Sequence, residues 1–504
     1  MYFLLKFKII MKNKERQVVT FANKLKKIAL KALSKGDYEL SLSAISACGF
    51  LYYSWNQFYR DSVLEEYLNI ISNQLVLPSF SRNEVNKDVV LFYDSFGGDV
   101  RGLTIIYLKT LCELGYNVIY VSPLKYKDKQ PILNKTLNNY NVKYEYVNRN
   151  NYKETVDVFT AIINKYRPYS IFMHLLPNDT AAITVLNAYK DVIKRYQINL
   201  TDHAFWLGLN AFDFCIEFRT LGATISNKYR GIDCKKIILN PYYPYIDKNL
   251  PFKGFPSEIS NKKVIFSGGA LYKILGDEEQ LYFKIVELLL LNNPNVAFVY
   301  ATNDKSATSY FKHIIDKFPN RCIVIRERND LFQVLKHSVL YLNTYPLSGG
   351  LMTQYAAIAG KLPLTLNQKN SESLDGILID NESLGVEFLD YLQLIEEANK
   401  LLNDEGYRLQ REALLNNAVI SEEKFRHSLS GILENNNSEY TVNVNGEISL
   451  EDFRQNYIRN FSINSIKHSQ VLKNWKCLSI YFPLSFIGAS FNFLFNLFKK
   501  IIVK

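Results

Sequence analysis

Phe266-Ser-Gly-Gly-Ala-Leu-Tyr-Lys-Ile274 and Asn343-Thr-Tyr-Pro-Leu-Ser-Gly-Gly-Leu-Met-Thr-Gln-Tyr355 are the two stretches that decide the fold of this 504-residue chain. Each follows an apolar, β-branched run and precedes a helical pattern. In open α/β sheets, such turns lie where the carboxyl end of a strand meets the N-terminus of a helix, and phosphorylated ligands bind there. The pair therefore predicts a nucleotide-diphosphate site.

Short strand patterns alternate with helical patterns from Asp88 onward. This alternation predicts parallel, doubly wound sheets, and a stretch rich in proline, tyrosine and lysine divides it into two series. The predicted fold class is therefore α/β, with two tandem Rossmann-like doubly wound domains. The expected strands are 88–93, 117–122, 143–147, 170–175 and 197–201, then 263–267, 296–301, 322–325, 339–342 and 362–366. The expected parts of the chain are a helical lead-in (1–85), an N-terminal Rossmann-like acceptor domain (86–240), a crossover linker (241–262), a C-terminal Rossmann-like donor domain (263–430), and a flexible segment with a basic aromatic tail (431–504).

The composition is that of a globular protein with a basic surface. The chain has 48% hydrophobic and 22% charged residues, and 60 Lys and Arg against 49 Asp and Glu. A net charge of +11 suits nucleic acid, anionic lipid or a phosphorylated small molecule. Nucleic acid is not an expected partner, because the basic residues do not cluster with aromatic residues along the α/β units. The six cysteines show no C-x-x-C spacing, so we expect no zinc site and a reducing cytoplasmic compartment.

The C-terminal tail has the composition of a membrane-surface segment. Leu478 to Phe498 contains no charged residue and is flanked by lysines. A spanning helix needs about 20 apolar residues, and Pro483 and several polar residues interrupt this run. We therefore expect 473–504 to lie on an anionic membrane surface and to hold the protein on the inner membrane face. The alternative is an amphipathic helix that packs on the protein's own core.

Residues 12–76 predict about three helices. One turn in this segment has the look of a tetratricopeptide hairpin, but a single unit needs neighbours to bury its faces. We interpret the segment as a helical lead-in and as a platform for a protein partner.

Two Rossmann-like domains joined by a crossover describe the GT-B architecture, and the residues of the second domain resemble a GT-B family. Ala270-Leu-Tyr-Lys-Ile274 resembles the Leu-Tyr-Lys-Ile element of the O-linked N-acetylglucosamine transferases and their bacterial relatives. Asn343 to Tyr355 is similar to the Asp-Thr-Pro-x-x-x-Gly-x-Thr-Thr segment of that family. The resemblance covers roughly residues 260–370 and implies a GT-B glycosyltransferase that takes a UDP-sugar.

The resemblance also implies which residues hold the donor. Lys273 matches the lysine that meets the diphosphate, where it would neutralise the departing charge without a metal. The N–H groups and positive dipole at the helix start attract phosphate, and the Thr353 hydroxyl would add a donor. We expect no metal and no cofactor, the sugar nucleotide being a substrate. The expected donor-binding residues are Gly268, Gly269, Lys273, Arg326, Ser348, Gly349, Gly350, Leu351, Met352, Thr353 and Gln354.

For two of these positions, Gln354 and Arg326, the sequence leaves alternatives open. Many GT-B enzymes place a glutamate for the ribose hydroxyls just inside this helix, whereas Gln354 and Tyr355 stand there in this chain. The donor sugar is therefore not predicted. Arg326 follows a strand where related enzymes hold the base; the alternative is a solvated charge run that caps a helix.

In the first domain, two strand ends carry candidate residues. Gly97 and Gly98 lie in a loop where a sugar could approach the backbone closely. Asp202 and His203 follow the strand expected at 197–201, and an imidazole beside a carboxylate can remove a proton from an acceptor hydroxyl. The alternative for His203 is a structural role beside its aromatic neighbours, and His174 is the second candidate base. Asn227, Lys228 and Arg230 are expected in a surface loop, with the acceptor side as the alternative.

The favoured function is sugar transfer from a nucleotide-diphosphate sugar, preferably a UDP-sugar, to a hydroxyl acceptor, in bacterial glycoprotein or surface-glycan synthesis. A second possibility is a sugar-nucleotide epimerase, which acts on the donor alone. A third is a catalytically silent GT-B partner that binds another transferase through its helical lead-in.

Overall fold

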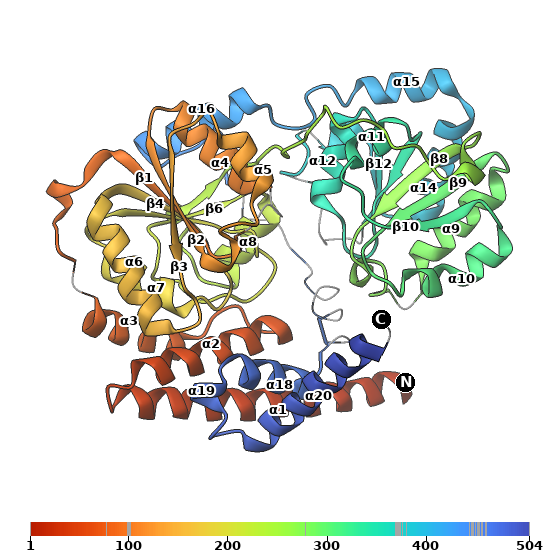
Figure 1. The fold of residues 1–504 in the computed structure, drawn as a ribbon. Helices are drawn as coiled ribbons and strands as arrows, with labels where there is room; N and C mark the ends of the chain where they lie inside the picture. The colour runs from red at the N-terminus through yellow and green to blue at the C-terminus, as the bar shows by residue number, and fades with distance from the viewer. Residues whose placement is uncertain are drawn as a thin grey trace.

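The computed structural model describes residues 2–76, 78–97, 102–277, 279–367, 374, 376–379, 381–442, 444, 448, 450, 454, 457–458 and 461–502. Two α/β domains stand side by side, and a layer of helices runs beneath them (Figure 1). Both ends of the chain lie in this helical layer. Because each domain is built on a parallel sheet, the predicted α/β class with two tandem Rossmann-like domains is confirmed.

The first domain is built on a seven-stranded sheet with the strand order β3-β2-β1-β4-β5-β6-β7. All neighbouring strands pair in parallel. The order reverses between β1 and β4, and in such sheets ligands bind beyond the carboxyl ends of the strands near this point. The strands are β1 (Asn86–Asp94), β2 (Asn117–Pro123), β3 (Val142–Val147), β4 (Pro168–His174), β5 (Lys194–Ile198), β6 (Phe214–Glu217) and β7 (Ile237–Leu239).

The second domain repeats this plan with six strands in the order β10-β9-β8-β11-β12-β13. The reversal lies between β8 and β11, so both glycine stretches leave the sheet at its switch point. The strands are β8 (Lys263–Gly268), β9 (Val296–Ala301), β10 (Cys322–Ile325), β11 (Leu340–Leu342), β12 (Pro363–Leu366) and β13 (Glu387–Phe388).

Helices cover both faces of each sheet, because parallel strands that are apolar on both sides must be buried on both sides. The first domain carries α4 (Gly102–Glu113), α5 (Pro131–Leu137), α6 (Tyr152–Tyr166), α7 (Thr180–Ala188) and α8 (Thr220–Lys228). The second carries α9 (Leu281–Asn292), α10 (Ala307–Lys317), α11 (Leu331–Lys336), α12 (Gly350–Ile358), α13 (Asn381–Leu384), α14 (Tyr391–Asn403) and α15 (Glu405–Ala413).

One helix of the C-terminal part returns to the first domain. In α16 (Glu422–Asn435), Phe425 packs edge-on against Tyr107 of α4, with ring centroids 5.1 Å apart. The Tyr196 hydroxyl of β5 donates to the carbonyl oxygen of Ile432 over 3.2 Å. The boundary expected at residue 430 therefore falls inside a helix that packs on the first domain.

The helical lead-in and the C-terminal tail form a single layer. Phe21 of the lead-in packs edge-on against Phe482 of the tail with centroids 5.1 Å apart, and Trp55 meets Phe461 at 4.9 Å. Part of the expected flexible segment lies outside the described residues, at 443, 445–447, 449, 451–453, 455–456 and 459–460. Among the helices that are described, none combines the length and apolarity required to cross a membrane. The layer consists of α1 (Tyr2–Leu33), α2 (Tyr38–Trp55), α3 (Ser62–Leu75), α18 (Ile463–Lys473), α19 (Trp475–Leu478) and α20 (Pro483–Ile502).

Candidate functional site

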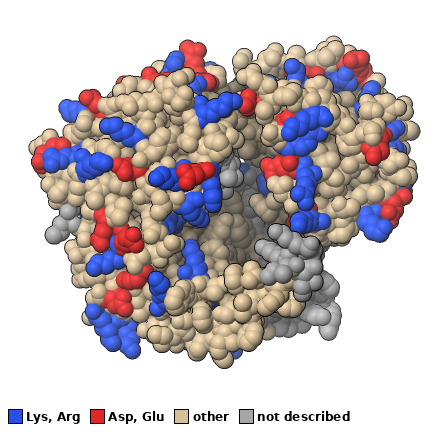
Figure 2. Space-filling model, in the orientation of Figure 1, with Lys and Arg blue, Asp and Glu red and all other residues tan. Residues whose placement is uncertain are grey.

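A cavity of about 970 Å³ lies between the two domains. Its first-domain wall comes from α4, α5 and the linker, and its second-domain wall comes from the loops after β8, β9 and β10 and from the start of α12. Gly268, Gly269, Leu351 and Met352, which the sequence predicted as donor contacts, all line it. Figure 2 shows that the molecule is hollowed between the domains and that Lys and Arg side chains lie along this hollow.

A smaller pocket of about 160 Å³ adjoins this cavity, and Tyr272 and Leu351 line both. Its walls bring together Asp202 and His203 with the donor-binding residues predicted in the other domain, and they add Arg219, which was not predicted. The first domain contributes Asp202, His203 and Arg219, and the second domain contributes Lys273, Ser348 and Gly350. The candidate base and the candidate diphosphate cation therefore face one space.

Lys273 joins the two glycine stretches. It ends a short 3₁₀ turn (Leu271–Lys273) after β8, and its Nζ donates to the carbonyl oxygen of Ser348 over 2.8 Å. Burial, with the charge of Arg219 nearby, lowers the pKa of Lys273 to about 8. Gly268 is required on steric grounds, since a Cβ there would lie 2.8 Å from the carbonyl oxygen of Ala301.

Asn343, which the sequence analysis did not single out, organises the second glycine turn. Its Oδ1 accepts hydrogen bonds from the Gly349 N–H over 2.8 Å and from the Thr344 N–H over 2.9 Å. Its Nδ2 donates to the Thr353 and Thr365 hydroxyls over 2.9 and 3.0 Å. The start of α12 is thus held in place by one buried amide. The first N–H groups of a helix have no acceptor within the helix, so this end of α12 suits an anionic ligand.

Two predicted donor contacts have other roles in the structure. The Thr353 hydroxyl is buried and donates to the Gly349 carbonyl oxygen over 3.1 Å, so it is not placed to bond a phosphate. The Gln354 amide is also buried and donates to the carbonyl oxygens of Tyr242 and Ile377 over 2.7 and 3.1 Å. Both residues lie on the inner face of α12, and this corrects their prediction as donor-binding side chains.

Arg326, the residue predicted to contact the nucleobase of the donor, is not part of the cavity lining. Arg326 is exposed and does not line the cavity, whereas Arg328 does. The Arg328 guanidinium pairs with Asp330, with Nε 2.8 Å from Oδ1, and also donates to the Gly254 carbonyl oxygen over 2.6 Å. Hydrogen bonding to Arg328 lowers the pKa of Asp330 below its usual value. The arginine that lines the cavity is therefore Arg328, which is paired with Asp330 and bound to the linker, and not Arg326.

His203 and Asp202 form a contacting pair because β5 ends at Ile198 and a turn follows. His203 Nδ1 lies 3.0 Å from Asp202 Oδ1, and the Tyr457 hydroxyl lies 3.3 Å from Nε2. Asp202 also accepts from Arg219 Nε over 2.6 Å. Burial favours the neutral carboxyl, but the Arg219 charge and these hydrogen bonds outweigh it and hold the pKa of Asp202 well below its usual range.

His174 and Gly97 have structural positions. His174 is 1% exposed, pairs with Asp94 at 3.1 Å and stacks on Phe96, and it lines neither pocket. At Gly97, with φ +62°, a Cβ would overlap the ring of Tyr126, so this glycine is needed for local packing. Gly98 lies outside the described residues.

Arg230 is buried, which corrects its prediction as a surface-loop residue. Its Nη2 donates to the carbonyl oxygens of Asp202 and Ala204, each over 2.6 Å. Asn227 and Lys228, expected in the same loop, belong to α8. Arg219 was missed, and Arg230 was placed wrongly, because each meets its partners only after β5, β6 and α8 are assembled.

No protein-family model and no curated protein sequence matches the chain. Solved structures do match. A mutant of the O-GlcNAc transferase of Thermobaculum terrenum is similar over 87% of this chain and 84% of its own, with 13% identity and a TM-score of 0.51. A glycosyltransferase from Rickettsia africae is similar over 69% of this chain and all of its own, with 15% identity and a TM-score of 0.50. The two-domain architecture is therefore the GT-B fold.

Proposed function

We propose that the chain is a metal-independent GT-B glycosyltransferase that moves a sugar from a nucleotide-diphosphate sugar, with a UDP-sugar favoured, to a hydroxyl acceptor. The observation that carries this proposal is the pocket that Lys273 and His203 share across the domain boundary. Beside it, the cavity of about 970 Å³ has room for a sugar nucleotide. Bacterial glycoprotein or surface-glycan synthesis is the setting that the sequence resemblance suggests for this activity.

The proposed reaction uses one group from each domain. The donor diphosphate lies against Lys273 and the N–H groups at the start of α12, where fixed positive charge stabilises the leaving group. The acceptor hydroxyl oxygen attacks the anomeric carbon as the bond from that carbon to the phosphate oxygen breaks. The hydroxyl proton passes to Nε2 of His203, and the Asp202 carboxylate stabilises the imidazolium that results. For this step, the Tyr457 hydroxyl has to yield its place beside Nε2 to the acceptor.

Donor binding is the first expected result. Titration calorimetry with UDP, UDP-N-acetylglucosamine and UDP-glucose should show saturable binding, because the cavity and Lys273 suit a nucleoside diphosphate. Absence of binding to every nucleotide sugar in a wider screen would refute the proposal.

Product analysis separates the three functions that a binding result allows. Release of UDP together with a free or transferred sugar, followed by NMR, supports transfer and reports the configuration at the anomeric carbon. Conversion of the donor into an epimer without UDP release identifies an epimerase. Binding with no turnover and no new acceptor product identifies a silent partner subunit.

The second part of the proposal concerns location: the C-terminal tail lies on the inner face of an anionic membrane. Tail side chains before and within α20 are strongly exposed, with Ile480 81%, Leu484 83% and Phe491 69% accessible. Trp475 is also half-exposed, and Lys476 lies 5.9 Å from its ring. An exposed aromatic face with flanking cations is typical of helices at a lipid interface.

Charge placed on this face should abolish membrane binding. The double variant Leu484→Glu and Phe491→Glu is expected to lose flotation with phosphatidylserine vesicles and to retain nucleotide binding. The matched control is Leu389→Glu with Leu392→Glu, because these leucines are similarly exposed, 68% and 57%, on the second domain. Equal flotation of both double variants would contradict the membrane role of the tail.

A further inference from the structure

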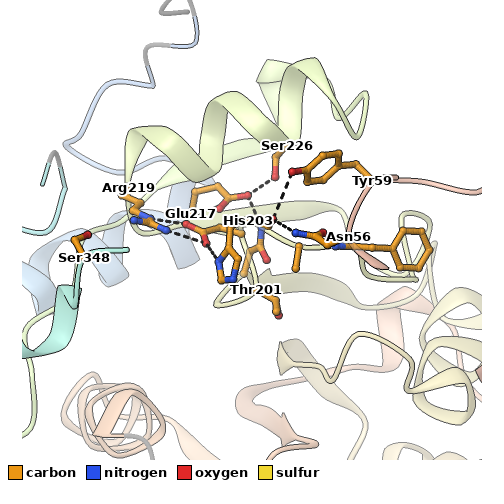
Figure 3. Close-up of polar contacts among 12 residues, drawn as sticks. Asn56, Tyr59, Thr201, His203, Glu217, Arg219, Ser226 and Ser348 are labelled. Carbon is orange, nitrogen blue, oxygen red and sulfur yellow. Dashed lines mark hydrogen bonds and ion pairs between the residues drawn. The ribbon is translucent and has the colours of Figure 1, made fainter. Parts of the chain in front are cut away.

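We propose that the helical lead-in is part of the catalytic apparatus, with Asn56 as a positioning residue for His203. The lead-in was interpreted from sequence as a platform for a protein partner. In the structure, the corner between α2 and α3 reaches the loop that carries the candidate base (Figure 3). The inference rests on the proposed role of His203 as the base.

Asn56 contacts this loop at two points. It is fully buried, and its Nδ2 donates to the His203 carbonyl oxygen over 3.0 Å while its Oδ1 accepts from the Phe205 N–H over 3.0 Å. This pattern is the one a neighbouring strand would make, and it fixes both the position and the plane of the loop backbone. Asn56 itself is fixed because it caps α2 in the left-handed region, with φ 49° and ψ 42°, and donates its N–H to Tyr52.

Tyr59 and Arg230 also contact the backbone of the loop that carries His203, from opposite sides. The Tyr59 hydroxyl, from the same corner, lies 3.5 Å from the His203 carbonyl oxygen. Arg230 holds the carbonyl oxygens on either side of that residue, at Asp202 and Ala204, and its guanidinium lies 5.4 Å from the Tyr59 ring centroid. Successive carbonyl groups of the loop are thus held alternately by the lead-in and by the first domain.

The position of the imidazole follows from this backbone support. The His203 imidazole contacts the side chains of Asp202 and Tyr457. Asp202 belongs to the same loop, whose backbone Asn56 and Arg230 hold. Proton abstraction requires the base to lie within hydrogen-bond distance of the acceptor hydroxyl. A displacement of about 1 Å can cost on the order of a hundredfold in rate. Loss of the Asn56 amide should therefore lower the turnover rate even when the fold is retained.

The structure offers a matched control for attachment of the helical layer. Asn178, which precedes α7, is also a buried asparagine, and its Nδ2 donates to the carbonyl and hydroxyl oxygens of Ser46 of α2, over 3.1 and 2.9 Å. It joins the layer to the first domain and lines neither pocket. Asn178→Ala therefore tests loss of a layer contact without a change at the His203 loop.

The test is Asn56→Gly, because glycine tolerates the left-handed backbone and removes only the amide. We expect kcat for donor turnover to fall at least about tenfold, with the dissociation constant for UDP unchanged. Asn178→Ala should keep the wild-type kcat although its melting temperature falls. The variant Asn56→Asp keeps an acceptor for the Phe205 N–H but turns an oxygen toward the His203 carbonyl, so it should behave like Asn56→Gly.

Selective ¹⁵N labelling of the six histidines gives a second readout. The imidazole signal assigned through His203→Ala should shift in Asn56→Gly and not in Asn178→Ala. A wild-type kcat with an unshifted signal in both Asn56 variants would overturn the inference. So would equal losses of kcat in the Asn56 and Asn178 variants. If His203→Ala itself keeps its turnover, the proposed base is wrong, and that failure is distinct from the failure of Asn56 alone.

Discussion

His203→Ala is expected to lower kcat for sugar transfer by about 10²- to 10⁴-fold, the usual contribution of a general base. The affinity for UDP should stay close to that of wild type, because Lys273 and the start of α12, which are proposed to hold the diphosphate, belong to the other domain. Single-turnover measurements under saturating donor, with calorimetry on the same samples, separate the two effects. A parallel loss of UDP binding and turnover would show that His203 supports the fold instead.

The chain contains its own comparison for this experiment. His174 and Asp94 form a second pair at the end of a strand, with a 3.1 Å contact against 3.0 Å for His203 and Asp202. The His203 side chain is 28% exposed in the pocket, whereas the His174 side chain is 1% exposed. His174→Gln should therefore lower the melting temperature and leave the turnover of the folded protein unchanged. Similar losses of turnover in His174→Gln and His203→Ala would contradict the assignment of the base to His203 and of a structural role to His174.

The sequence was sufficient for the parts of the fold that local patterns determine. Apolar strand patterns followed by helical spacing predicted both sheets, and the two glycine stretches predicted a site at the switch point of the second. Lys273 was predicted because it stands next to a glycine turn in a short motif that resembles a family element. Its contact with Ser348 joins the two stretches, as expected of one site.

The features that the sequence did not predict depend on contacts between segments that are distant in the chain. The fifth strand was expected at 197–201 but lies at Lys194–Ile198, because the polar Arg195 is buried and satisfied by Asp213, over 2.8 Å, only in the folded chain. The strands β6, β7 and β13 were not among those predicted. Thr353 and Gln354 were expected to face the cleft, but both lie on the side of α12 that is buried in the second domain. Asn56 lies about 150 positions from Phe205, so no local pattern could connect them.

Lys273→Met is expected to weaken UDP binding by about a hundredfold, the equivalent of about 3 kcal/mol for a hydrogen bond to a charged group. Methionine keeps the length of the side chain and removes its charge. The control is Lys263→Met, because Lys263 lies at the opposite end of β8 and its Nζ also donates to a carbonyl oxygen, that of Leu402, over 2.7 Å. Calorimetry on both variants should show the loss in Lys273→Met alone.

The lowered pKa of Lys273 predicts opposite effects of pH on UDP binding and on folding stability. The pKa of Lys273 is lowered from 10.5 to about 8, so UDP affinity should fall as the pH rises above about 8 and the ammonium loses its proton. Between these two values, the unfolded chain binds more protons at this residue than the folded chain, so folding stability should rise with pH there. Since the side chain is half-buried, we expect the contribution to be about 2 kcal/mol, discounted from the full shift. Relative to wild type, Lys273→Met should therefore be more stable at pH 7 and lose this advantage by pH 10.5, as measured by urea unfolding. A pH-independent difference in stability between the two proteins would mean that the ammonium is solvated and that its pKa is not lowered in the folded chain.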